Sequence, residues 1–224
     1  MGTITRTFAN NITTSGVFKP TAFNNASFDN VTSVPSGSLP AGGSMVLLST
    51  QTASSSASIS FTTGIDSTYK EYMFVFNNIH PQTDLAAFKF NLSTDGGSNY
   101  NVTKTTTLFR SYHFENDTTA GLGYRTGSDL AQSTAYQVFG DSPTAGTGND
   151  NDQHNSGYLH LFNPASTTYV KHFISSGVEC LYEDAIINYF VAGYGNTTSA
   201  VNAIDFQFSS GNIDAGTIQM FGIL

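Results

Sequence analysis

The chain has 224 residues, and its charged side chains are scarce, at 11% against about 25% in an average soluble domain. Hydrophobic residues make up 39% and aromatic residues 13%, enough for a buried core, which excludes an intrinsically disordered chain. Eight basic and sixteen acidic residues give 8 − 16 = −8, a net charge that repels phosphate and argues against nucleic acid as a partner. The polar surface must therefore consist mainly of Ser, Thr, Asn, Gln and Gly, a composition more usual in β-rich assembled or extracellular proteins than in cytosolic enzymes.

The first 43 residues are expected to form a docking arm and linker. No helical or alternating period runs through this stretch, and its last ten residues contain two prolines and three glycines, which oppose regular structure. Apolar side chains in such an arm would be poorly solvated, so the arm should lie on its own body, on a sister subunit or on a larger assembly. The alternative is a partly ordered tail. The residues expected to anchor the arm are Phe8, Phe18, Phe23 and Phe28.

From residue 44 onward the pattern predicts short strands separated by turn residues, as in an all-β sandwich over residues 44–224. The segment Tyr69–Ile79 is apolar on both faces and predicts a central strand covered on both sides, whereas Phe88–Ser93 alternates and should have one solvated face. About ten strands and almost no helix are expected. The predicted strands are Met45–Leu48, Ala57–Thr62, Tyr69–Ile79, Phe88–Ser93, Thr105–Phe114, Ala135–Phe139, Gly157–Phe162, Tyr169–Ser175, Ile186–Tyr194, Ala203–Phe208 and Gly216–Ile223.

One segment, Glu183–Ala192, also allows a helix, but its β-branched and aromatic residues favour a strand. Two long polar loops are expected at Glu115–Ser133 and Gly140–Ser156, and loops of this length are usually functional or mobile. Cys180 is the single cysteine, so no disulfide can form within the chain. No segment approaches the roughly 20 apolar residues of a membrane-spanning helix, and no secretion signal is recognisable, so no membrane partner is expected.

Residues with metal-binding or catalytic chemistry are few. Asp150 and Asp152 lie in an Asn-rich loop that could offer oxygen ligands to calcium, but the spacing does not match an EF-hand, and neither a metal nor any other cofactor is predicted. No Gly-x-Ser-x-Gly motif occurs, and nothing around Cys180 indicates an activated thiolate. A carboxylate pair of the kind that glycoside hydrolases use could come from Glu179 with Glu183 or Asp184, although a turn between strands explains these residues equally well.

Aromatic residues in predicted loops and strand ends suggest contact with sugars, because tyrosine rings can stack on the apolar faces of glycans. For each of them, packing in the core or at a subunit contact is the competing interpretation. The candidates for glycan contact are Tyr100, Tyr112, Tyr124 and Tyr136.

Several segments share their strand and turn residues with a known family: LSTQTA at Leu48–Ala53, SISFTTGIDSTY at Ser58–Tyr69, FNNIHP at Phe76–Pro81, and the closing stretches Ile204–Phe206, Ser210–Ile218 and Phe221–Ile223. These segments resemble structural proteins of tailed bacteriophages, notably marine ones. The likeness covers most of residues 43–224 and consists of strand and turn patterns without a catalytic motif, so it assigns no active-site residue.

The resemblance implies a jelly-roll-like antiparallel β-sandwich that assembles as an oligomer, often a trimer, on the head or tail of a virion. It fits an all-β body with a docking arm. The leading hypothesis is therefore a non-enzymatic virion structural protein, either a capsid decoration or a tail fibre component. Two alternatives remain: a carbohydrate-binding module that recognises host surface glycans, and a glycan hydrolase.

Overall fold

The computed structural model describes residues 44–140 and 145–224. The predicted docking arm, its four phenylalanines and its boundary with the body lie outside these residues. The described part consists of strands, turns and loops and contains no helix, which confirms the prediction of an all-β sandwich. No helix long and apolar enough to cross a membrane occurs in these two ranges.

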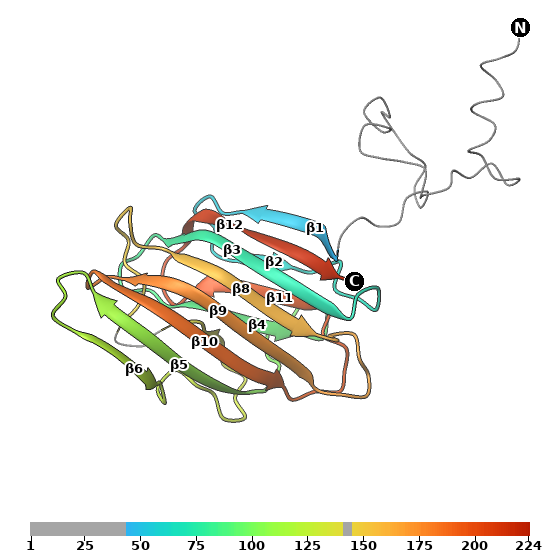
Figure 1. The fold of residues 1–224 in the computed structure, drawn as a ribbon. Coiled ribbons are helices and arrows are strands. Elements are labelled where there is room, and N and C mark those ends of the chain that lie inside the picture. Colours follow the sequence, from blue (N-terminus) through green and yellow to red (C-terminus); the bar gives the residue numbers. More distant parts are fainter. Residues whose placement is uncertain (1–43, 141–144) are drawn as a thin grey trace, which may run out of the picture. The chain divides into compact units, whose positions relative to one another are not determined.

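The described strands form two antiparallel sheets that pack face to face. The large sheet has the order β1-β12-β3-β8-β9-β10-β5-β6, and the small sheet has the order β2-β11-β4-β7. Figure 1 looks onto the large sheet, with the small sheet behind it. The strands are β1 (Met45–Thr52), β2 (Ile59–Phe61), β3 (Glu71–Pro81), β4 (Phe88–Ser93), β5 (Lys104–Phe114), β6 (Ala120–Tyr124), β7 (Gln137–Val138), β8 (Asn155–Phe162), β9 (Lys171–Leu181), β10 (Ala185–Gly195), β11 (Ala203–Phe208) and β12 (Ile213–Ile223).

Eight of these strands form a jelly roll. When the hairpins β5–β6 and β9–β10 are set aside, the sheets reduce to β1-β12-β3-β8 and β2-β11-β4-β7. The chain passes from one sheet to the other at almost every connection, and only β4 and β7 are successive strands of one sheet. This is the double Greek-key arrangement that defines a jelly roll. The expected jelly-roll-like sandwich is therefore present in the described residues.

The two remaining hairpins widen the large sheet. β5–β6 is inserted between β4 and β7, β9–β10 is inserted between β8 and β11, and all four strands add to the β8 edge. The small sheet has no matching extension, so long loops cover the inner side of the inserted strands. Gln137 accepts a hydrogen bond from Thr106 of β5 at 2.5 Å, and the Leu130 amide donates to the same threonine at 2.7 Å.

Phenylalanine rings from both sheets form the centre of the core. In β3, Tyr72, Phe74 and Phe76 alternate inward, because successive side chains of a strand point to opposite faces. The Phe76 ring lies 5.4 Å from that of Phe206 in β11 and 5.0 Å from that of Phe139. Each of these rings is at most 1% exposed. Burial of such side chains stabilises the fold by about 1.5–3 kcal/mol each.

The sandwich has two chemically different ends. At the proximal end, Ser44 leads into β1 and Leu224 follows β12, and the Leu224 amide donates to the Ser44 carbonyl at 3.0 Å. The antiparallel registers place residues 82–87, 115–119, 145–154, 182–184 and 209–212 at the opposite, distal end. In Figure 1 the end of β12 and the tip of β5 mark these two ends.

The structure corrects four details of the predicted strands. β6 lies inside the segment 115–133 that was expected to be a loop, because its glycine-rich sequence hides the strand, and β7 is shorter than the predicted Ala135–Phe139. β9 continues to Leu181, well beyond the predicted Ser175. The polar face of β4 is not solvated: Asn91 is fully buried, and its amide donates to the carbonyl oxygens of Tyr100 and Thr134 in loops that pack over it.

The prediction for β3 holds for one of its two faces. Tyr72, Phe74 and Phe76 are buried against the small sheet, but Met73 and Val75 on the other side are only half-buried. Within the described residues nothing forms a second layer over that side. The sandwich therefore buries the apolar side chains on the inner side of β3 and leaves those on its outer side partly exposed.

Candidate functional site

The outer side of the large sheet carries most of the exposed apolar side chains of the described body. They project from β8 and from all four inserted strands, and their exposed fractions range from 39% for Tyr158 to 76% for Leu122. We call this set the apolar face. Its members are Phe109, Leu122, Tyr124, Tyr158, Ile174, Val178, Ile186 and Phe190.

Strand register aligns these side chains across the sheet. Phe109 is paired with Tyr124 of β6 on one side and with Phe190 of β10 on the other. The rings of Phe109 and Phe190 are stacked, with centroids 5.0 Å apart and planes inclined by 13°. Such cross-strand aromatic pairs contribute about 0.5–1.5 kcal/mol beyond their buried area. Beside this pair, a shallow groove lined by Tyr158, Ile174 and small side chains crosses the sheet.

Ionised side chains are nearly absent from this side of the large sheet. On β5, β6, β9 and β10, none of the outward-pointing residues is Asp, Glu, Lys or Arg. Further along the sheet, Glu71 contacts the imidazole of His160, and Asp214 lies 3.7 Å from His80. Monomeric proteins rarely expose a continuous uncharged surface of this kind unless it binds something.

Acidic side chains gather instead at the distal end. Seven exposed carboxylates lie in the described distal loops, and these loops contain no lysine or arginine. The acidic residues are Asp84, Glu115, Asp117, Asp150, Asp152, Glu183 and Asp184. Among residues 44–140 and 145–224, no three His, Cys, Asp or Glu side chains are grouped so that they could hold a metal ion. The calcium candidates Asp150 and Asp152 therefore gain no support from the geometry.

The predicted carboxylate pair is divided between the interior and the surface. Glu179 is 1% exposed, and its Oε1 accepts a hydrogen bond from Thr147 Oγ1 at 2.9 Å. Glu183 lies in the exposed β9–β10 turn, where its carboxylate accepts from the Tyr182 hydroxyl at 2.7 Å. Asp184, in the same turn, accepts from the Gln153 amide at 3.0 Å. These side chains do not face each other across a cleft.

Cys180 has the opposite chemistry to an activated nucleophile. Burial raises the pKa of its thiol, and the nearby charges of Asp152, Glu115 and Glu179 raise it further. Because the thiolate is the reactive form, a raised pKa makes the side chain less nucleophilic at neutral pH.

Two of the four tyrosine candidates come together on the small sheet. The Tyr136 hydroxyl donates to the Asp205 carboxylate at 3.0 Å, and the charge of Asp205 also raises the pKa of Tyr100 nearby, after burial as the main cause. Asp205 is 3% exposed, and burial raises its pKa. The Lys89 ammonium lies 5.2 Å from the Tyr136 ring centroid and covers one ring face. The Tyr136 hydroxyl and one face of its ring therefore have partners within the protein.

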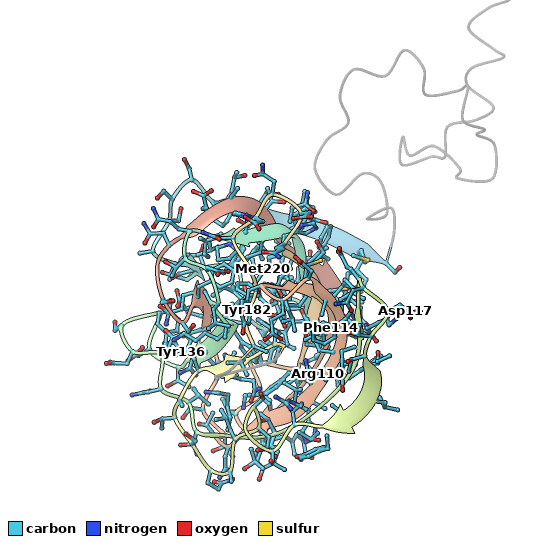
Figure 2. The ribbon with its side chains drawn as sticks, turned by 90° about the vertical axis from the view of Figure 1, so that its left-hand side faces the viewer. Arg110, Phe114, Asp117, Tyr136, Tyr182 and Met220 are labelled. Carbon is cyan, nitrogen blue, oxygen red and sulfur yellow. The ribbon has the colours of Figure 1, made fainter. Side chains whose placement is uncertain are left out.

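The other two tyrosines lie elsewhere. The Arg110 guanidinium covers the Tyr112 ring at 4.7 Å, whereas Tyr124 is 51% exposed at the edge of the apolar face. In the end-on view of Figure 2, Tyr136 and Asp117 lie on opposite sides of the molecule, and Arg110 lies between them. The four candidates therefore do not form one glycan site, and a sugar ligand stays a prediction.

Sequence reasoning missed the apolar face, although a signal for it existed. In β10, apolar residues occupy successive positions, as in Ile186-Ile187 and Tyr189-Phe190, so both sides of the strand are apolar. Apolar residues at successive positions were also the reason for predicting that β3 is covered on both sides. Applied to β10 and β9, it would have predicted an outward apolar surface, but only the register shows that these residues align.

Fold and surface together define a widened jelly-roll sandwich with an uncharged apolar face on the outer side of its inserted strands. Comparison with protein-family models, with curated proteins and with solved structures gives no match for this chain.

Proposed function

We propose that this protein is a non-enzymatic structural component of a tailed-phage virion. It would form a homo-oligomer, with a trimer favoured by the resemblance, and decorate the head or form part of a tail fibre. The observation that carries the proposal is the apolar face: an uncharged surface of this extent suits a subunit in an assembly, since burying charge at an interface is costly unless the charge is paired. The sequence resemblance supplies the class of assembly.

The difference between the two ends of the body supports docking by the arm. Ser44 leads into β1 at the proximal end, whereas the acidic loops lie at the distal end. A protein attached to a particle through residues 1–43 would therefore present its long acidic loops outward. In this division of roles, the phenylalanines of the arm supply apolar contact with the particle.

Replacing Phe8, Phe18, Phe23 and Phe28 together by Ser is expected to abolish attachment to particles that lack the protein. Each buried phenylalanine contributes about 1.5–3 kcal/mol, so the four changes should weaken binding at least ~100-fold. Co-sedimentation of the full chain with such particles measures the effect.

The matched control replaces the same four residues by Leu, which keeps apolar area and should keep most of the binding. Thermal unfolding of each variant shows whether the body stays folded, because the core of the described residues is formed by side chains between Ala53 and Met220. Undiminished sedimentation of the serine variant would contradict docking through these side chains.

A further inference from the structure

We propose that the apolar face is the surface through which copies of this chain pack against one another. The inference rests on the assembly proposed above and names the interface that the assembly uses. The occupant of the face is a second copy of the chain, and the contact involves the outer side of the large sheet, centred on the stacked pair Phe109 and Phe190.

The apolar face is large enough to form the centre of an interface between subunits. The five strands that carry the apolar face, from β8 to β6, lie about 4.8 Å apart and span about 19 Å. The six-residue separation of Ile174 and Cys180 along β9 spans about 20 Å, which gives a footprint of about 400 Å². Half-buried apolar residues such as Met73 and Val75 continue the surface beyond β8. Each partner in a standard-size protein interface contributes about 800 Å². A copy of the same sheet is large enough to cover this area.

The distribution of charge also favours a second copy of the chain as the occupant of the apolar face. A nucleic acid, an anionic lipid surface or a charged peptide would find no countercharge on the outer side of the inserted strands. Two copies of the chain each carry −8, but their exposed distal carboxylates lie in loops at one end of the sandwich. Contact through the apolar face therefore brings few like charges together, since the carboxylates beside it have partners within the chain: Asp129 accepts from the Tyr124 hydroxyl at 2.5 Å, and Glu71 contacts His160.

The chemistry of the surface also resembles the centre of subunit contacts. Interface centres are depleted in charged residues and enriched in Tyr, Phe and Met. Phe109, Phe190, Tyr124 and Tyr158 provide rigid aromatic area, and the groove beside them can accept a protruding side chain of the neighbouring copy. The outward apolar side of β3, which no part of the described body covers, would be covered in the same contact.

The test is the mass of the full chain in solution, measured by light scattering after size exclusion. The wild type should have a multiple of 23.9 kDa. The double variant Phe109→Thr/Phe190→Thr and, separately, Ile174→Lys should dissociate to a monomer, with at least ~100-fold weaker association if the aromatic pair is an energetic centre. Threonine favours strands, so the first variant keeps local β-propensity.

Tyr169→Thr is the matched control, because Tyr169 is 70% exposed in the β8–β9 loop and lies outside the apolar face. It should leave the mass unchanged. Circular dichroism of each variant distinguishes dissociation from unfolding. A monomeric wild type at about 100 μM, well above the dissociation constant of stable oligomers, would overturn the inference. An unchanged mass in both folded face variants would also overturn it.

These outcomes are separate from those of the proposed function. Failure of the face variants to dissociate leaves docking by the arm untouched, because the arm experiment measures sedimentation with particles. Failure of the arm experiment likewise leaves the mass measurement valid.

Discussion

Gly177→Ala is expected to lower the free energy of unfolding by about 3 kcal/mol, through overpacking of a core that has no room for one methyl group. Gly177 in β9 lies opposite Gly157 in β8, and the Tyr189 ring of β10 reaches over Gly177. A Cβ added at Gly177 would lie 2.5 Å from Cζ of Tyr189 and 2.7 Å from the carbonyl oxygen of Ser156. Tyr189 is fully buried and cannot withdraw.

The expected sign is opposite to the general trend, since glycine inside a strand is usually less favourable than alanine. For a body of this size, the loss corresponds to a fall in melting temperature of about 6–12 °C. Gly123→Ala is the control: Gly123 lies on the edge strand β6, and no atom lies within 4 Å of its added Cβ. Equal stability of the two variants would show that the space around Gly177 is not filled as described.

Lys104→Met is expected to remove a strong pH dependence of stability. Lys104 is fully buried at the proximal end of β5, where its ammonium donates to Asn91 Oδ1 and to the Val102 carbonyl at 2.8 Å. Burial lowers the pKa of Lys104 from 10.5 to about 7. Between these two pH values the unfolded chain binds a proton that the folded protein lacks, so stability rises with pH. The slope from this group is about 1.4 kcal/mol per pH unit.

Below pH 7 both states are protonated, and above pH 10.5 neither is, so the contribution is flat outside this window. Urea unfolding at pH 7.5, 8.5 and 9.5 should show a smaller slope in Lys104→Met than in the wild type, by up to about 1.4 kcal/mol per pH unit. Lys70→Met, at an exposed position before β3, should keep the wild-type slope. Identical slopes in wild type and Lys104→Met would contradict a neutral buried amine.

A second lysine shares this environment. Lys171 begins β9, is fully buried, and donates to the carbonyl oxygens of Tyr169 and Thr197 at 2.6 and 3.1 Å. Both lysines flank Gly195 in register, so they lie in one row of the sheet. These hydrogen bonds go to amide and carbonyl oxygens rather than to carboxylates. Each amino group donates to carbonyl oxygens of loop residues at the proximal end, so its hydrogen-bonding capacity is used inside the body.

Much of the local structure could be predicted from the sequence. β-Branched and aromatic residues correctly favoured a strand over a helix at Glu183–Ala192, where β10 runs from Ala185 to Gly195. Clean apolar and polar alternation also located β4 and β11. These signals are local, since they depend only on how successive side chains point from a strand.

The candidate site could not be predicted in the same way. Tyr100 and Tyr136 meet at Asp205 only because β4, β11 and the loops beside them pack together, and Glu179 lies inside because of the register of β9. The sequence could not distinguish an exposed carboxylate at a turn from one inside the sandwich, because both follow the same residue pattern.

The sequence by itself determined an all-β body, most of its strand positions, the scarcity of charge and the apolar character of β3 on both sides. The tertiary structure decided that two inserted hairpins widen a jelly roll, that seven exposed acids gather at its distal end, and that Phe109 and Phe190 stack on an outer surface without charged neighbours on the inserted strands. The physical reason is that strand propensity depends on neighbouring residues, whereas register and sheet order depend on hydrogen bonds between residues far apart in the chain.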